Sequence, residues 1–211
     1  MNILTFILLF TLSDNPPGTI KVKDYYVDKT EILNIHWLEY LHHQRQTLDS
    51  TEMLEHLPDS ANGWYAMPAN RFKPIVFITY EQAINYCEWR SKIVSERIGK
   101  KVTYRLPTMA EWQDIATEAL ETDLKQQEKD LKETMETIKE NAGEYVLIGR
   151  AKTKSRVYDL FDNVTEMTQD KGVAMGANNY ELTDLKSNAT RWVKYDSPNA
   201  YLGFRCIAEI E

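Results

Sequence analysis

Cysteine is scarce in this chain: the 211 residues include only two, Cys87 and Cys206. No run of Lys and Arg is present either, and the formal net charge of −7 argues against a nucleic-acid-binding surface, which is normally basic. The sequence contains no G-x-S-x-G element, no phosphate-binding loop and no His–Glu zinc motif. Internal repeats and low-complexity tracts are missing as well. The length suits one domain with a substantial core.

Long hydrophobic runs are limited to the N-terminus. Residues 1–12 are almost wholly apolar, and residues 13–18, with two prolines and a glycine, end that run. About a dozen apolar residues are too few to cross a bilayer but suit the core of an export signal, with Thr11 and Ser13 as small residues before a cleavage point. No Lys or Arg precedes the run, and a buried N-terminal strand is the alternative. We therefore expect a leader over residues 1–18, no transmembrane span, and one domain over residues 19–211.

The polarity pattern of the remaining chain predicts both strands and helices. Alternating polarity over residues 19–27 predicts a strand, and a helix is expected over residues 29–43. Residues 44–74 are interrupted by prolines and a glycine, so an irregular stretch is expected there. Residues 118–141 are rich in Glu and Lys, with apolar residues at mostly helical spacing, which predicts a helical insertion at the surface.

Two capping boxes mark where helices begin. In each, a threonine is followed three residues later by a residue that can return a hydrogen bond to it: Thr79 with Gln82, and Thr108 with Glu111. Gly99 is well placed to end the first of these helices, because glycine readily adopts the left-handed conformation needed after a helix. The insertion described above is then predicted to extend the second.

The octet at residues 105–112, R-L-P-T-M-A-E-W, is far more specific than a helix start requires. Pro107 ends the preceding extended run, and Arg105 is held at the junction with a guanidinium free to make a forked contact. The octet resembles the R-L-P-T-E-A-E-W signature of the formylglycine-generating (sulfatase-modifying factor) domain family. Other segments resemble that family in the same order: residues 28–32, 74–89, 158–168 and 202–206.

The resemblance implies an α+β fold, a variant of the C-type lectin fold, with few regular elements and two or three helices packed on small antiparallel sheets. It also implies a disulfide between Cys87 and Cys206, because both fall at positions that match a bridge of the family. Such a bridge would close a loop of roughly 120 residues and, by lowering the chain entropy of the unfolded state, would stabilise the fold by about 4–5 kcal/mol. Disulfides persist outside the cytosol, so the bridge and the export signal support each other. If the bridge does not form, the alternative is that both cysteines are buried thiols without a chemical role.

Family members that make formylglycine hold copper with two cysteines shortly before the closing G-F-R-C element. Soft thiolates are the ligands that select Cu(I). The matching segment here, residues 172–198, contains no cysteine. We therefore expect that the protein neither binds copper as a cofactor nor synthesises formylglycine.

Calcium is the other cofactor that the resemblance implies. Asn163, Val164 and Glu166 resemble the calcium-binding G-N-V-W-E-W element of the family, and amide, carbonyl and carboxylate oxygens suit that ion. Asp162 replaces the glycine of that element, and Thr165 replaces its first tryptophan. The alternative is a structural turn in which backbone N–H groups satisfy Glu166.

Framework residues account for most of the remaining motif positions. Arg105, Arg191 and Arg205 are expected to make buried hydrogen bonds to carbonyl groups and to Glu111 or Glu166, because buried arginines are normally paired. Trp112, in the first turn of its helix, is assigned the same structural role. His36 and His43 share a helix face without a third ligand nearby, which is more typical of boundary residues than of a metal site.

These observations favour a non-catalytic member of the family, exported from the cytoplasm, that acts as a binding or scaffold module for a protein or glycan of the cell envelope. No catalytic residue is assigned. The alternative is an enzyme with copper-independent chemistry in the same cleft. The residues expected to line that cleft are Tyr180, Asp184, Arg191 and Tyr195.

Overall fold

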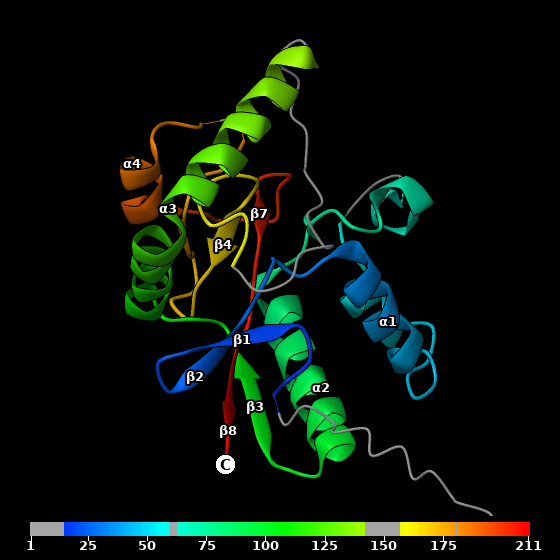
Figure 1. Cartoon of the computed structure of the whole chain (residues 1–211). Helices are drawn as coiled ribbons and strands as arrows, with labels where there is room; N and C mark the ends of the chain where they lie inside the picture. Colours follow the sequence, from blue (N-terminus) through cyan, green and yellow to red (C-terminus); the bar gives the residue numbers. More distant parts are fainter. Residues whose placement is uncertain (1–14, 60–62, 142–156, 180) are drawn as a thin grey trace, which may run out of the picture.

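Within residues 15–59, 63–141, 157–179 and 181–211, which the structure describes, this computed structural model has four α-helices and two four-stranded sheets (Figure 1). The α-helices are α1 (Asn34–Gln44), α2 (Tyr80–Ile98), α3 (Met109–Glu140) and α4 (Leu185–Thr190), and three 3₁₀ helices, η1 (Glu52–His56), η2 (Trp64–Ala66) and η3 (Pro68–Asn70), lie between α1 and α2. The predicted α+β class is confirmed, although α4 is not predicted from the sequence. Most of the predicted leader, residues 1–14, lies outside the described residues.

The first sheet is antiparallel and has the order β1-β2-β8-β3. Its strands are β1 (Thr19–Val22), β2 (Tyr25–Asp28), β3 (Val102–Arg105) and β8 (Ile207–Ile210). The prediction of one strand over residues 19–27 is wrong, because a turn at Lys23 and Asp24 divides it into a hairpin in which Val22 faces Tyr25. Lys23 adopts a φ of 53°, a left-handed conformation that sequence patterns do not predict for lysine.

The second sheet has the order β6-β5-β4-β7. Its strands are β4 (Thr165–Met167), β5 (Val173–Met175), β6 (Trp192–Lys194) and β7 (Leu202–Gly203). Its β4–β5 and β5–β6 pairs are antiparallel, as expected, whereas the β4–β7 pair is parallel. Glu166 lies in β4 of this sheet, and Arg205 follows β7 closely in the chain. The sheet therefore brings the segments at residues 158–168 and 202–206 together.

The sequence pattern predicts that the first helix begins at Lys29, but α1 begins at Asn34. The preceding segment is instead held in extended form by neighbouring chain. The Ile32 N–H donates to the Phe204 carbonyl at 2.8 Å, and the Ile32 carbonyl accepts from the Ile75 N–H at 2.8 Å. Tertiary backbone pairing therefore overrides local helix propensity at residues 29–33.

Both capping boxes form as predicted. The Thr79 hydroxyl accepts from the Gln82 N–H and the Thr108 hydroxyl from the Glu111 N–H, and each returning side chain is in place. Helix α2 ends at Gly99, whose φ is 70°. The predicted extension of the next helix is confirmed, since α3 reaches Glu140, with non-helical φ and ψ at one residue inside it, Asp123.

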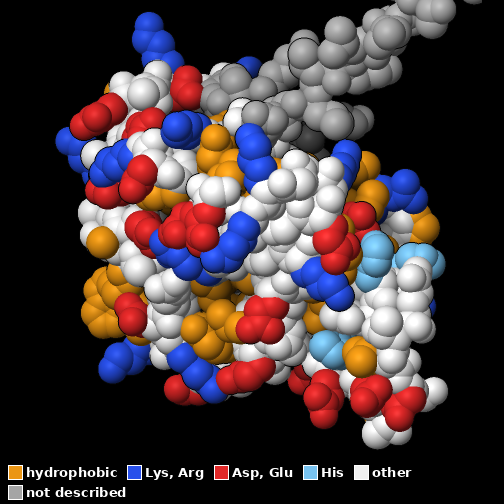
Figure 2. Space-filling view, turned by 90° about the horizontal axis from the view of Figure 1, so that it is seen from below, with side chains coloured by type: hydrophobic (Ala, Val, Ile, Leu, Met, Phe, Trp, Pro, Cys, Tyr) orange, Lys and Arg blue, Asp and Glu red, His pale blue; other side chains and the backbone are white. Residues whose placement is uncertain are grey.

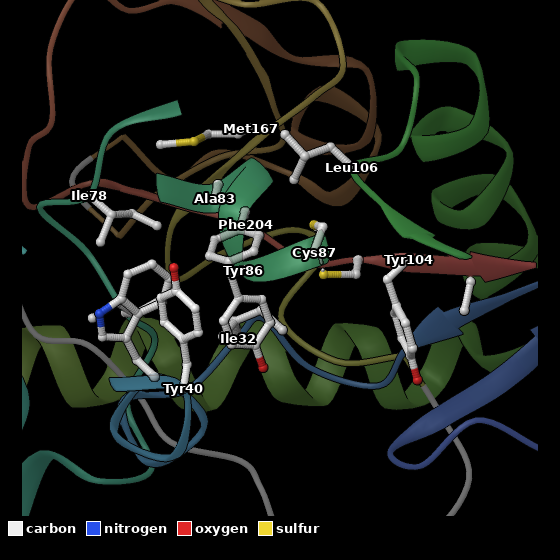
Figure 3. Packing of buried hydrophobic residues seen from close by; sticks show 14 of the residues in the cluster. Ile32, Tyr40, Ile78, Ala83, Tyr86, Cys87, Tyr104, Leu106, Met167 and Phe204 are labelled. Atoms are coloured by element: carbon white, nitrogen blue, oxygen red, sulfur yellow. Dashed lines mark hydrogen bonds between the residues drawn. The ribbon is translucent and has the colours of Figure 1, made fainter. Parts of the chain in front are cut away.

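The helices lie on two sides of the sheets, with α1 and α2 on one side and α3 and α4 on the other (Figure 1). A buried cluster around α1 and α2 includes Trp37, which stacks on Tyr86 with ring centroids 5.5 Å apart. The Phe204 ring meets Tyr86 edge-on at 5.6 Å (Figure 3). A second cluster packs α3 against the β1–β2 hairpin and is centred on Trp112 and Ile115. Segments distant in the sequence thus share one interior.

The surface in Figure 2 carries acidic and basic side chains interspersed with one another rather than in separate fields. Of the helices described, none is both long and apolar enough to cross a bilayer.

Candidate functional site: the tyrosine pocket and the buried polar centre

A buried ion pair between Arg205 and Glu166 lies where the two sheets and α3 meet. The Arg205 Nε donates to Glu166 Oε2 at 2.7 Å and Nη2 donates to Oε1 at 2.5 Å, with the two side chains 0% and 1% exposed. The remaining guanidinium donors bind the carbonyls of Asp28 at 3.1 Å and Tyr158 at 2.8 Å. The indole Nε1 of Trp112 donates to Glu166 Oε2 at 2.9 Å. The expectation that backbone N–H groups satisfy Glu166 is therefore wrong.

The other two arginines behave differently from each other. Arg105 makes the predicted fork, with Nη1 and Nη2 donating to the two oxygens of Glu111 at 2.9 and 2.7 Å. This pair joins β3 to the first turn of α3 and also receives Glu209 from β8. Arg191 pairs with Glu181 at the surface, so the prediction of buried pairing with Glu111 or Glu166 is wrong for it.

The residues expected to bind calcium have other contacts. The Asn163 Nδ2 donates to Glu31 Oε1 at 2.9 Å, and the Asn163 N–H donates to Asn179 Oδ1 at 2.6 Å. Val164 packs its side chain against Gly203, where an added Cβ would come within 2.8 Å of it. A cation at Glu166 would have to displace the Arg205 guanidinium. Calcium binding by these residues is not tested by the structure and stays a prediction.

The Glu31 carboxyl is part of the same buried centre. Burial, followed by the nearby Asp159 carboxylate, raises its pKa above the ordinary value. It is 1% exposed, and its contact to Asn163 connects residues that lie far apart in the sequence. The polar centre thus holds together segments that lie far apart in the sequence, as a buried structural network does, although Glu31 Oε2 has no hydrogen-bond partner among the described residues.

The two cysteines meet in the core beside the aromatic cluster (Figure 3). The Cys87 and Cys206 sulfur atoms are 3.4 Å apart and both side chains are buried, as free thiols. Burial, together with the neighbouring Cys87, raises the pKa of the Cys206 thiol. Copper requires thiolates in an accessible site, so this buried neutral pair does not fit it. The structure brings the predicted partners together, and the bond between them stays a prediction.

A surface pocket of about 340 Å³ lies at one end of the second sheet. Three segments line it: residues 78–81 at the start of α2, the turn at residues 171–172, and residues 195–198 after β6. We call it the tyrosine pocket, after Tyr80 and Tyr195. The third of these segments belongs to the region that would carry the copper ligands in a catalytic family member.

The polar groups of the tyrosine pocket are held in defined positions. The Tyr80 hydroxyl donates to the Gln169 carbonyl at 2.8 Å, and Lys171 lies over the Tyr80 ring, 5.9 Å from its centroid, while pairing with Glu81. The Tyr195 hydroxyl is buried and donates no hydrogen bond to a described residue. Burial raises the pKa of Tyr195 to about 12, against the lowering effect of the nearby Gly172 backbone N–H, so the phenol stays protonated at neutral pH and can donate. An unpaired buried hydroxyl is costly unless a ligand or water satisfies it.

Of the residues predicted to line the catalytic cleft, the structure describes three, and only Tyr195 among them lines this pocket. Asp184 caps α4 by accepting from the N–H groups of residues 186 and 187. Arg191 pairs with Glu181, and Tyr180 lies outside the described residues. Sequence reasoning missed Tyr80 and Lys171, because nothing in the local pattern connects residues so far apart along the chain.

The profile of the Sulfatase-modifying factor enzyme 1-like domain matches residues 7–210. Among solved structures, PvdO from Pseudomonas aeruginosa is similar, with 14% identity, 88% of this chain and 80% of that chain covered, and a TM-score of 0.48. The crystal structure of CarF is similar at 13% identity, with 89% and 87% covered and a TM-score of 0.49. No curated protein matches the sequence.

Proposed function

Because this chain belongs to the Sulfatase-modifying factor enzyme 1-like family, we propose that it is a non-catalytic member that binds a partner through the tyrosine pocket. One observation carries the proposal. The segment that would supply the metal-binding thiolates contributes Tyr195 and Gly172 to the pocket and contains no sulfur donor, while both thiols of the chain are buried in the core. On this proposal, binding groups stand in the segment where catalytic family members carry redox groups.

The pocket suits a single sugar unit or protein side chain that offers a hydrogen-bond acceptor. The Tyr195 hydroxyl carries a proton that no described residue accepts, and the Tyr80 and Tyr195 rings provide a rigid apolar surface. The Lys171–Glu81 pair at the mouth adds charged groups of both signs. We place the protein outside the cytoplasm, bound to a protein or glycan of the cell envelope. The apolar run at residues 1–12 and the adjacent cysteine pair support that location.

The alternative of copper-independent catalysis lacks support from the pocket. Lys171 is committed to Glu81, and the Tyr195 hydroxyl has no base within hydrogen-bonding distance among the described residues. A nucleophile or general acid needs such a partner to be activated.

Anaerobic titration with Cu(I) tests the non-catalytic part. We expect no stoichiometric tight complex and no conversion of a cysteine-containing sulfatase peptide, before or after copper is added. A tight copper complex that is lost in the Cys87→Ala variant would show that the buried thiols can open to a metal, and would overturn this part.

A binding screen tests the pocket. Wild-type protein is measured against soluble cell-wall oligosaccharides and against envelope proteins crosslinked to it in its native host. Any ligand found is then measured with Tyr195→Phe, which removes only the uncommitted hydroxyl, and with Tyr26→Phe on β2, away from the pocket, as the matched control. We expect about tenfold weaker binding in the first variant alone, the usual loss for one hydrogen bond in a binding site. Equal affinities would place the binding site elsewhere.

A further inference from the structure

A second pocket, of about 250 Å³, lies between α1 and α2. Residues 17–18, residue 28 and residues 30–32 complete its lining. It shares no lining residue with the tyrosine pocket, and nothing in the proposed function uses it. The two helices lie beside each other on the same side of the fold (Figure 1).

The lining of this pocket includes a fixed ion pair between Arg90 and Asp28. Arg90 donates from Nη1 and Nη2 to the two oxygens of Asp28 at 2.7 and 2.8 Å, and Nη2 also reaches the Pro17 carbonyl at 3.1 Å. Its guanidinium lies over the Tyr104 ring, 4.1 Å from the centroid, and Asp28 accepts in addition from the Cys206 N–H. Asp28 is therefore saturated by the protein itself, and its charge is balanced by Arg90.

His36 presents a hydrogen-bond donor to the pocket. Its Nδ1 accepts from the Leu33 N–H at 3.3 Å, which places the ring proton on Nε2. Nε2 has no partner among the described residues. Burial, followed by the neighbouring Arg90 charge, lowers the pKa of His36 to about 4, with Asp28 opposing that effect. At neutral pH the ring is thus an uncharged N–H donor.

The mouth of the pocket carries two charged side chains that are not paired with each other. Arg97 on α2 and Glu39 on α1 are exposed, and neither makes an ion pair with a described residue. The walls between them are apolar and aromatic, from Trp89, Ile93 and Val94. The uncommitted donors, Arg97 and the His36 N–H, favour an anion, whereas Glu39 disfavours a second negative charge on it.

We infer that this pocket binds a small monocarboxylate with an apolar body, its carboxylate held by Arg97 and His36 and its hydrocarbon part by the Trp89 wall. Arg97 and His36 line the same pocket, and a guanidinium and a neutral imidazole N–H are each suitable donors to a carboxylate. The volume is slightly below that of common ligand pockets, which suits a molecule of few atoms. Of the other acidic residues in the lining, Asp28 is paired with Arg90, and burial raises the pKa of Glu31, whose Oε2 has no hydrogen-bond partner among the described residues. With Glu39 at the rim as well, the pocket accommodates a single negative charge.

Butyrate is the probe, with butyramide as its uncharged analogue and butylamine as its cationic one. We expect saturable binding of butyrate alone by NMR titration, with shifts in the Trp89 indole and His36 ring signals. The pKa of His36 should rise when butyrate is bound, because a carboxylate beside the ring favours the charged form. That rise is a readout that a structural role of His36 would not produce.

Two variants separate the pocket from a general charge effect. Arg97→Gln should weaken butyrate binding about tenfold, the usual loss for a charge-assisted contact, while Lys92→Gln removes an exposed charge from the same helix outside the pocket and should change nothing. Arg97 is exposed, so its loss does not threaten folding. Butyramide binding as tightly as butyrate, equal affinity in the two variants, or no saturable response in the wild-type protein would each overturn the inference.

Discussion

Arg205 and Glu166, which are 39 residues apart in the sequence, form a fully buried, doubly hydrogen-bonded ion pair that connects the chain after β7 to strand β4. Removing one partner of such a pair leaves a charge in the core without compensation. We expect Arg205→Met to lower the free energy of unfolding by about 3–5 kcal/mol. Urea unfolding monitored by tryptophan fluorescence measures the change.

The matched control for this prediction is Arg191→Met. Arg191 pairs with Glu181 where both side chains are partly exposed, so its loss should cost at most about 1 kcal/mol. Equal losses in the two variants would mean that burial of the Arg205 pair does not matter. Should Arg205→Met fail to fold, Trp112→Phe removes the indole donor to Glu166 and provides a milder change of the same centre.

Local sequence rules were enough to predict the parts of the fold that depend on neighbours a few residues apart. The capping boxes at Thr79 and Thr108 and the end of α2 at Gly99 follow from hydrogen bonds between residues three or four positions apart. The Arg105 fork to Glu111 is of the same kind, because strand and helix adjoin at residues 106–108. Motif resemblance then supplied the fold class.

What the sequence did not reveal depends on contacts between distant segments. The helix expected at Lys29 begins late because Ile32 is drawn into backbone pairing with Phe204 and Ile75. The tyrosine pocket joins Tyr80 to Tyr195, and no periodicity within either segment indicates the other. Such arrangements are fixed by packing of the whole domain, which local propensity does not encode.

Acid should weaken the junction between β3 and α3. Hydrogen bonds from Arg105 lower the pKa of Glu111 to about 2 from an ordinary value of 4.5. The unfolded chain therefore binds more protons than the folded one between these values, and stability falls as pH decreases through that window. We expect Glu111→Gln to be less stable than wild type by about 1 kcal/mol at pH 7, a small value because the pair is partly exposed.

Unfolding measurements at several pH values test whether acid lowers the contribution of Glu111 to stability. The difference in unfolding free energy between wild type and Glu111→Gln should shrink as pH falls from about 4.5 toward 2. In an Arg105→Gln background the pH-dependent part should become smaller, because the largest cause of the lowered pKa is gone while the hydrogen bonds from Thr108 remain. A difference that stays constant with pH in the wild-type background would contradict the assignment.

The adjacent sulfur atoms of Cys87 and Cys206 predict a response to redox conditions. Protein from an oxidising compartment should show no free thiol when denatured and two after reduction, because only a small movement separates 3.4 Å from a bond. Reduction should lower the free energy of unfolding by about 4–5 kcal/mol, the value for so long a loop. A Cys87→Ala/Cys206→Ala variant should show no dependence on reductant. Two free thiols in exported protein would contradict the bridge.

The distal half of α3 is held to the domain by a polar contact that can be tested on its own. The Thr134 hydroxyl donates to Asp162 Oδ2 at 2.5 Å, and both residues are buried. Thr134→Val keeps the shape of the side chain and removes the donor to a buried carboxylate, so we expect a loss of about 1–3 kcal/mol in unfolding free energy.

The matched control is Thr137→Val, one turn along the same helix. It removes a hydroxyl that bonds only to the Glu133 carbonyl at the surface and should change stability by less than about 0.5 kcal/mol. Hydrogen exchange of the α3 amides should separate the two variants further, with faster exchange in the distal half for Thr134→Val alone. Equal exchange and equal stability in both variants would mean that this half of the helix is held by its apolar contacts and not by Asp162.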